Sequence, residues 1–190
     1  MDCNLKNLFG NVRGLNSGAK RTAVRSVISA TTPAIMCLQE SKFSHISGST
    51  VLDTLGPLFE DFYLLPATGT RGGVLLVWHR SHVSLSNPLI GEHHITALVS
   101  PATEDSHWWL TGVYGPQDDE AKLDFLADLH DVRDSRTGPW LLGGDFNMIT
   151  LAADKNNSNV NHRVMNRFRQ FIANDELRDM YLHGAPLHLV

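Results

Sequence analysis

Polar side chains that can bind a metal ion or a phosphate follow apolar runs in this sequence. In the segment 140–147, an apolar run leads into two glycines and then into Asp145 and Asn147. If the strand continues that far, residues i and i+2 point the same way, and the two side chains share one pocket at its carboxyl end. A carboxylate beside an amide suits a hydrated divalent cation and a phosphate oxygen. Gly, Asp and Asn also form ordinary turns, so this motif needs support from elsewhere in the chain.

Three further polar residues end apolar runs in the same way, namely Asn11, Glu40 and Tyr114. In a packed α/β sandwich these strand ends can converge on one rim, where they offer two carboxylates, two amides and a phenol. Each has a plainer alternative. Asn11 can cap a loop, Glu40 can be a solvated carboxylate, Tyr114 can be a core aromatic with a wet hydroxyl, and Asp145 and Asn147 can form a turn.

Length and composition fit one globular domain over residues 1–190. The chain has 42% hydrophobic and 19% charged residues, an ordinary profile for a globular protein with a sizeable core. No apolar stretch approaches the roughly 18–20 residues that a membrane span needs. The N-terminus lacks a signal-peptide pattern, which favours an intracellular protein. Of the two cysteines, Cys37 lies inside an apolar run and is predicted to be a buried small hydrophobe.

The net charge of −4 argues against a module that coats nucleic acid by positive charge alone. It does not argue against a nuclease, because a metal and a few local basic groups can meet the phosphate. The ten histidines show no Cys/His spacing typical of zinc sites. His93 and His94 are predicted to be an exposed pair near a strand start. Arg71, on a Gly-rich loop, is either a DNA phosphate contact or a solvated charge.

Hydrophobic periodicity predicts a mixed order of strands and helices, which favours a packed α/β sandwich over a strictly alternating parallel fold. Ser17 is expected to cap the first helix. The expected strands are 8–12, 34–38, 62–65, 74–78, 83–89, 95–100, 108–114 and 140–145, and the expected helices are 19–28, 51–59, 118–131 and 161–175.

Five segments occur in an order that resembles the endonuclease/exonuclease/phosphatase superfamily. Within it, the chain resembles the apurinic-type endonuclease domains of LINE-type non-LTR retrotransposons, especially those of plants. The resemblance implies a four-layer α/β sandwich, with two mixed β-sheets flanked by helices. The segments are 11–16 (NVRGLN), 38–40 (LQE), 72–75 (GGVL), 113–116 (VYGP) and 143–147 (GGDFN).

The resemblance also implies divalent-metal-dependent cleavage of a phosphodiester, with DNA as the partner and a nuclear location, and it points to no particular protein partner. Glu40 is expected to ligate Mg²⁺ or Mn²⁺, and Asn11 to help fix the metal and the phosphate. Tyr114 is expected to hydrogen-bond the phosphate. Asp145 is expected to orient or deprotonate the attacking water, while Asn147 holds a phosphate oxygen. The metal would stabilise the developing charge as a Lewis acid.

The sequence departs from this family pattern at two places. Many relatives carry Trp before the first Asn, where this chain has Gly10. The Ser-Asp-His motif that ends the family domain is absent from the sequence. We therefore expect a domain that lacks its C-terminal strands and has impaired activity. Two alternatives stay open: an inactive retrotransposon-derived remnant or DNA-binding fragment, and a superfamily phosphatase acting on a small phosphoester.

Overall fold

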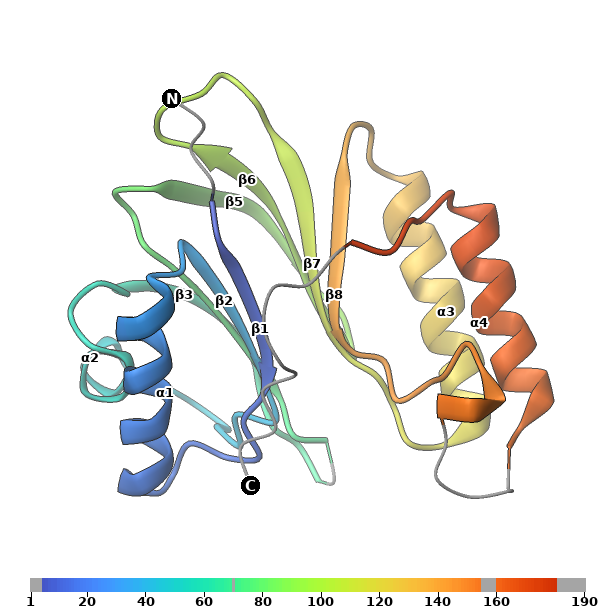
Figure 1. Cartoon of the computed structure of the whole chain (residues 1–190), viewed down its shortest axis with the longest axis horizontal. Helices are drawn as coiled ribbons and strands as arrows, with labels where there is room; N and C mark the ends of the chain where they lie inside the picture. The colour runs from blue at the N-terminus through green and yellow to red at the C-terminus, as the bar shows by residue number, and fades with distance from the viewer. Residues whose placement is uncertain (1–4, 70, 155–159, 181–190) are drawn as a thin grey trace. The chain divides into compact units, whose positions relative to one another are not determined.

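The apolar runs of the sequence form the strands of two four-stranded sheets (Figure 1). The computed structural model describes residues 5–69, 71–154 and 160–180. The first sheet has the order β1-β2-β4-β3 and the second β5-β6-β7-β8. The strands are β1 (Asn7–Asn11), β2 (Ile35–Gln39), β3 (Asp61–Leu65), β4 (Val74–Trp78), β5 (Val83–Ile90), β6 (His94–Pro101), β7 (Trp108–Tyr114) and β8 (Trp140–Asp145).

Each sheet is mixed. In the first sheet, β1 pairs with β2 in parallel, and the other pairs are antiparallel. In the second sheet only β7 and β8 run parallel. The helices are α1 (Gly18–Thr31), α2 (Gly48–Leu55), α3 (Asp119–Asp134) and α4 (His162–Asn174), with a short 3-10 helix at Ala152–Asp154. Two mixed sheets accompanied by helices confirm the expected α/β fold class.

The chain forms two compact units. The first holds the described residues up to Tyr114 together with Gly138–Asp145, and therefore both sheets, α1 and α2. The second holds Gly115–Thr137 and the described residues from Phe146 onward, with α3 and α4. Among the described residues, no helix is long and apolar enough to cross a membrane.

The first sheet has an apolar core on each of its faces. Ile35 and Cys37 of β2 point toward strands of the second sheet, and Met36 and Leu38 point toward α1 and α2. Alternate residues of a strand point to opposite faces, so a strand with two covered faces must be apolar throughout. This arrangement explains the unbroken apolar runs of β2 and β4. Complete burial of Cys37 raises its thiol pKa to about 12, in agreement with the prediction of an inert buried residue.

The helix boundaries follow their capping residues. Ser17 accepts a hydrogen bond from the backbone amide of Lys20 at 3.3 Å, which confirms it as the cap of α1. The prediction of a helix at 51–59 was wrong at both ends, because Ser47 caps α2 four residues before Val51 and Gly56 ends it with φ of 91°. A C-terminal glycine with positive φ stops a helix without steric cost.

Gly143 serves packing within the first unit. A Cβ at this position would lie 2.7 Å from the ring of Phe9 on β1. In the structure Gly143 lies inside β8 and leaves room for an aromatic ring.

Candidate active site

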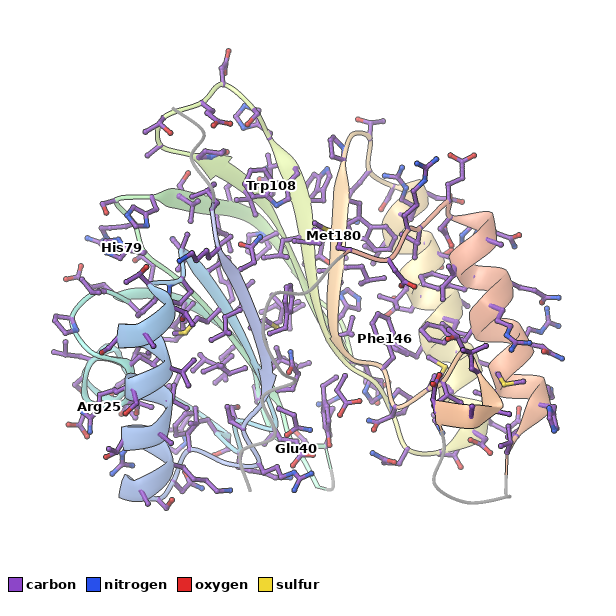
Figure 2. The ribbon with its side chains drawn as sticks, in the orientation of Figure 1. Arg25, Glu40, His79, Trp108, Phe146 and Met180 are labelled. Atoms are coloured by element: carbon purple, nitrogen blue, oxygen red, sulfur yellow. The ribbon has the colours of Figure 1, made fainter. Side chains whose placement is uncertain are left out.

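Four of the five predicted site residues lie together at the carboxyl ends of two parallel strand pairs. Asn11 ends β1 and is aligned with Gln39 of β2, which Glu40 follows directly. Tyr114 ends β7 and is aligned with Asp145, the last residue of β8. Parallel neighbours end on the same side of a sheet, so each pair of strands brings two polar residues together. Figure 2 shows Glu40 at the end of the first sheet where β1 finishes.

The side-chain amide of Asn11 joins the two carboxylates of this site. Its Nδ2 donates to Oε1 of Glu40 at 3.1 Å and to Oδ2 of Asp145 at 3.2 Å. Its Oδ1 accepts a hydrogen bond from the backbone N–H of Arg13 at 3.1 Å, which fixes the orientation of the amide. Asn11 therefore holds Glu40 of the first sheet close to Asp145 of the second.

Glu40 also accepts a hydrogen bond from the phenol of Tyr114, at 2.7 Å to the same Oε1. Burial raises the pKa of Glu40, but the hydrogen bonds from Tyr114 and Asn11, followed by the charges of Lys42 and Arg13, outweigh it. The pKa of this carboxyl is therefore below its usual value. The ionised form that results is the form that binds metal ions.

The backbone at Glu40 adopts an uncommon left-handed conformation, with φ of 53°. Non-glycine residues in this region are strained, and such strain is concentrated at functional sites. The carbonyl of Glu40 accepts a hydrogen bond from the amide of Gly14. Gly72 packs against the other side, where an added Cβ would lie 2.7 Å from Cγ and 2.9 Å from Cα of Glu40. The surrounding loops thus hold the carboxylate in place.

Sequence reasoning missed Lys42 and the role of Gly72. Nζ of Lys42 lies 3.9 Å from Oε2 of Glu40, and its backbone amide donates to the carbonyl of Gly72 at 2.9 Å. Lys42 has φ of 62°, so the chain turns sharply after β2 and brings this residue back toward the carboxylate. The two glycines at 72–73 indicate in the sequence that another group packs closely against this loop, but they do not indicate that this group is Glu40.

Asn147, the fifth predicted site residue, belongs to the second unit. Its side-chain amide donates to the carbonyl of Gly115 at 2.6 Å, and its φ is 53°. Because β8 ends at Asp145, the strand alternation that the sequence argument used does not reach Asn147. Its role as a phosphate ligand stays a prediction.

Arg71 and the two histidines His93 and His94 were also singled out in the sequence. Arg71 donates from a guanidinium nitrogen to the backbone carbonyl of Glu92 at 2.7 Å, so it links two loops of the first unit. The prediction that His93 and His94 form an exposed pair was wrong, because the side chain of His93 is only 15% exposed and His94 is completely buried. His94 begins β6, and its Nδ1 lies 3.2 Å from the hydroxyl oxygen of Thr96.

The donor set of the site fits a hard divalent cation. Glu40 and Asp145 supply carboxylate oxygens, the ligands that Mg²⁺ and Mn²⁺ prefer. Asn11 and Tyr114 both donate to Oε1 of Glu40, while no hydrogen bond reaches its Oε2 from the described residues. This oxygen is therefore available as a ligand. The amide nitrogen of Asn11, not its oxygen, faces the carboxylates, so its predicted role as a metal ligand remains a prediction.

The sequence profile of the endonuclease/exonuclease/phosphatase family matches residues 7–175, and this chain belongs to that family. The match covers the four residues clustered in the first unit. A comparison with curated protein sequences gives no match.

Solved structures of low sequence identity share the fold. An AP endonuclease from Archaeoglobus fulgidus has a TM-score of 0.67 at 17% identity, over 90% of this chain and 70% of its own. An AP endonuclease from Leishmania major has a TM-score of 0.58 at 18% identity, over 90% of this chain and 65% of its own. A D. rerio TDP2 complexed with single-strand DNA product has a TM-score of 0.56 at 14% identity, over 90% and 63%. The chain thus spans roughly two thirds of the length of these proteins.

Proposed function

We propose that this chain hydrolyses phosphodiester bonds in DNA with the help of Mg²⁺ or Mn²⁺. The observation that carries the proposal is the pair of hydrogen bonds from Asn11 to Glu40 and Asp145, which gathers two carboxylates at one point of the first unit. Family membership supports a phosphoesterase. Similarity in fold to two AP endonucleases and to a TDP2 bound to a DNA product supports DNA as the substrate.

Each clustered residue has a role in this proposal. Glu40 would hold the divalent cation, which when bound supplies Lewis acidity toward the phosphate. Asp145 orients the attacking water and accepts its proton. Asn11 keeps the two carboxylates together. Tyr114 keeps Glu40 ionised and in position, and its hydroxyl is also the candidate donor to the phosphate.

The finer proposal is an endonuclease of the LINE-type retrotransposon class. It rests on the five sequence segments in family order, from Asn11–Asn16 to Gly143–Asn147. Asn147 would hold a phosphate oxygen in this assignment. Two further segments, 154–157 (DKNN) and 177–184 (LRDMYLHG), resemble the plant versions of these elements, and their residues 155–157 and 181–184 lie outside the described residues.

The test is Mg²⁺-dependent nicking of supercoiled plasmid by the purified chain. Glu40→Gln and Asp145→Asn keep side-chain size and remove one charge each, and we expect each to lower the nicking rate by about a hundredfold or more. Glu104→Gln is the matched control, because Glu104 is an exposed glutamate whose carboxylate accepts a hydrogen bond from the hydroxyl of Ser106. Equal rates for the parent and both site variants would reject the assignment.

Two other outcomes separate the alternatives. If the chain is folded by circular dichroism and does not nick DNA at any Mg²⁺ or Mn²⁺ concentration, the inactive remnant is favoured. DNA binding by fluorescence anisotropy then tests whether the chain is a binding fragment. Release of phosphate from inositol phosphates or hydrolysis of sphingomyelin, without DNA cleavage, would favour the phosphatase.

A further inference from the structure

A second group of potential metal ligands lies in the other unit, at the ends of α3 and α4. His130 and Asp134 are one helical turn apart on α3, and Asp175 caps the end of α4. One ligand atom from each of the three residues lies within 4.8 Å of the others. Nδ1 of His130 is 2.9 Å from Oδ1 of Asp175, and its Nε2 is 3.6 Å from Oδ2 of Asp134. An imidazole therefore lies between two carboxylates.

Asp175 is buried, and only one of its two carboxylate oxygens has a hydrogen-bond partner among the described residues. Its side chain is 2% exposed, whereas that of His130 is 48% exposed. Oδ1 of Asp175 contacts His130, but its buried Oδ2 has no hydrogen-bond partner among the described residues. An unpaired buried carboxylate oxygen is costly, because it has lost its water without gaining a donor. Asp175 also lines a cavity of about 360 Å³ between α3 and α4.

The two helices add negative potential at the same place. α3 and α4 lie side by side (Figure 1). They run parallel, because their first turns are joined by hydrogen bonds. Asn161 at the start of α4 donates to Asp119 at the start of α3, and Arg163 donates to Glu120. Their carboxyl ends, at Asp134 and Asp175, therefore meet at the other end of the pair. Helix carboxyl ends carry partial negative charge, and carboxylates placed there are unfavourable unless a cation balances them.

We propose that His130, Asp134 and Asp175 form a binding site for Zn²⁺ that is separate from the candidate active site. A neutral imidazole and carboxylate oxygens are ligands that zinc accepts, and water fills its remaining positions. Zinc satisfies the second oxygen of Asp175, neutralises both helix ends and links α3 to α4. Protonated His130 leaves the second oxygen of Asp175 without a partner, since its ring contacts only Oδ1. The exposed side chains of His130 and Asp134 can adjust to the ion without disturbing the core.

The test measures zinc binding by isothermal titration calorimetry in the full chain carrying Glu40→Gln, which weakens the other metal site. In this background we expect one saturable zinc site per chain. His130→Gln and Asp134→Asn change exposed residues, and each is expected to weaken zinc binding at least tenfold. Cobalt in place of zinc gives a visible absorption band that depends on its ligands, which provides a second readout. Zinc is also expected to raise the Tm of the parent and not that of His130→Gln.

His162→Gln is the matched control, because His162 is an exposed histidine at the opposite end of α4. We expect this variant to bind zinc like the parent. Absence of saturable zinc binding, or equal affinity in the parent and in folded His130→Gln, would overturn the proposal. The result is independent of DNA cleavage, so the two proposals succeed or fail separately.

Discussion

Asn11 and Asp145 are 134 positions apart in the chain, and their side chains are joined by a hydrogen bond of 3.2 Å. The bond connects the last residue of β1 to the last residue of β8, and so the first sheet to the second. The same amide nitrogen reaches Glu40 at 3.1 Å. Two carboxylates held by one amide repel each other less than two bare ones, because the donor carries partial positive charge. The folded protein therefore keeps an anionic cluster together and ready for a cation.

Replacement of Asn11 by Asp tests this account. Asn11→Asp exchanges the shared donor for a third carboxylate of nearly equal size, so repulsion replaces two hydrogen bonds. We expect the free energy of unfolding in EDTA to fall by about 1–3 kcal/mol, because this partly buried position loses two hydrogen bonds to charged groups and gains a like charge. Millimolar Mg²⁺ should restore part of the loss, because a cation offsets the added charge. Urea unfolding followed by circular dichroism measures both effects.

Asn87→Asp is the control for the Asn11 variant. Asn87 is exposed on β5, and its change adds the same charge away from the cluster. Its stability should change by less than about 0.5 kcal/mol and should not respond to Mg²⁺. If the two variants behave alike, Asn11 does not hold the carboxylates together.

Tyr114→Phe probes the ionisation of Glu40. Burial raises the pKa of this carboxyl, and the phenol of Tyr114 is the foremost of the groups that lower it below its usual value. A carboxyl with a depressed folded-state pKa stabilises the protein above its unfolded pKa of about 4.3, and this stability is lost as the pH falls through the folded pKa. Without the hydroxyl, the pKa of Glu40 should rise, and acid unfolding should begin at a higher pH.

NMR titration of the Glu40 side-chain carboxyl, combined with the pH midpoint of unfolding, measures these two changes. Tyr63→Phe is the comparison, because its hydroxyl donates to the carbonyl of Leu85 at 3.0 Å and contacts no carboxylate of the site. A Glu40 pKa that is the same in Tyr114→Phe and in the parent protein would contradict the electrostatic role of the phenol.

Much of the fold follows from the sequence, because apolar periodicity reports which faces of an element are covered. The run at residues 74–78 predicts β4 with the bounds that the structure has, since both faces of this strand are buried. α2 was misplaced because a polar residue, Ser47, sets its start while the apolar positions begin only at Val51. His94 was misread because local polarity does not reveal that the first residue of β6 points inward.

The candidate site could be predicted only in part for a similar reason. The ends of apolar runs identify Asn11, Glu40, Tyr114 and Asp145, because strand ends are visible in a sequence. Lys42 and Gly72 act through a left-handed turn and a contact between two loops. Such tertiary relationships leave no periodic pattern. The strand alternation expected for Asn147 fails because β8 ends two residues earlier.

Gly72→Ala tests whether the loop at residue 72 positions Glu40. The new Cβ would lie 2.7 Å from Cγ and 2.9 Å from Cα of Glu40, so that residue or the loop must move. We expect a loss of stability of about 1–3 kcal/mol, as for other overpacked positions, and a larger proportional loss of any Mg²⁺-dependent activity. Gly18→Ala, where a Cβ meets nothing within 4 Å, is the control. Unchanged affinity for Mn²⁺ in Gly72→Ala would show that Glu40 tolerates the displacement.

Gly10→Ala should stabilise the protein. A Cβ at Gly10 meets no atom within 4 Å, and the position borders a small apolar cavity between β1 and α1 that Val24 and Val27 also line. Alanine restricts the unfolded chain and fills part of this space, so we expect the free energy of unfolding to rise by about 0.4–1 kcal/mol. Gly143→Ala should have the opposite sign, because its Cβ would lie 2.7 Å from the ring of Phe9. Urea unfolding of the two variants in parallel measures both effects. Destabilisation by Gly10→Ala would mean that the cavity beside Asn11 cannot accept a methyl group without moving β1.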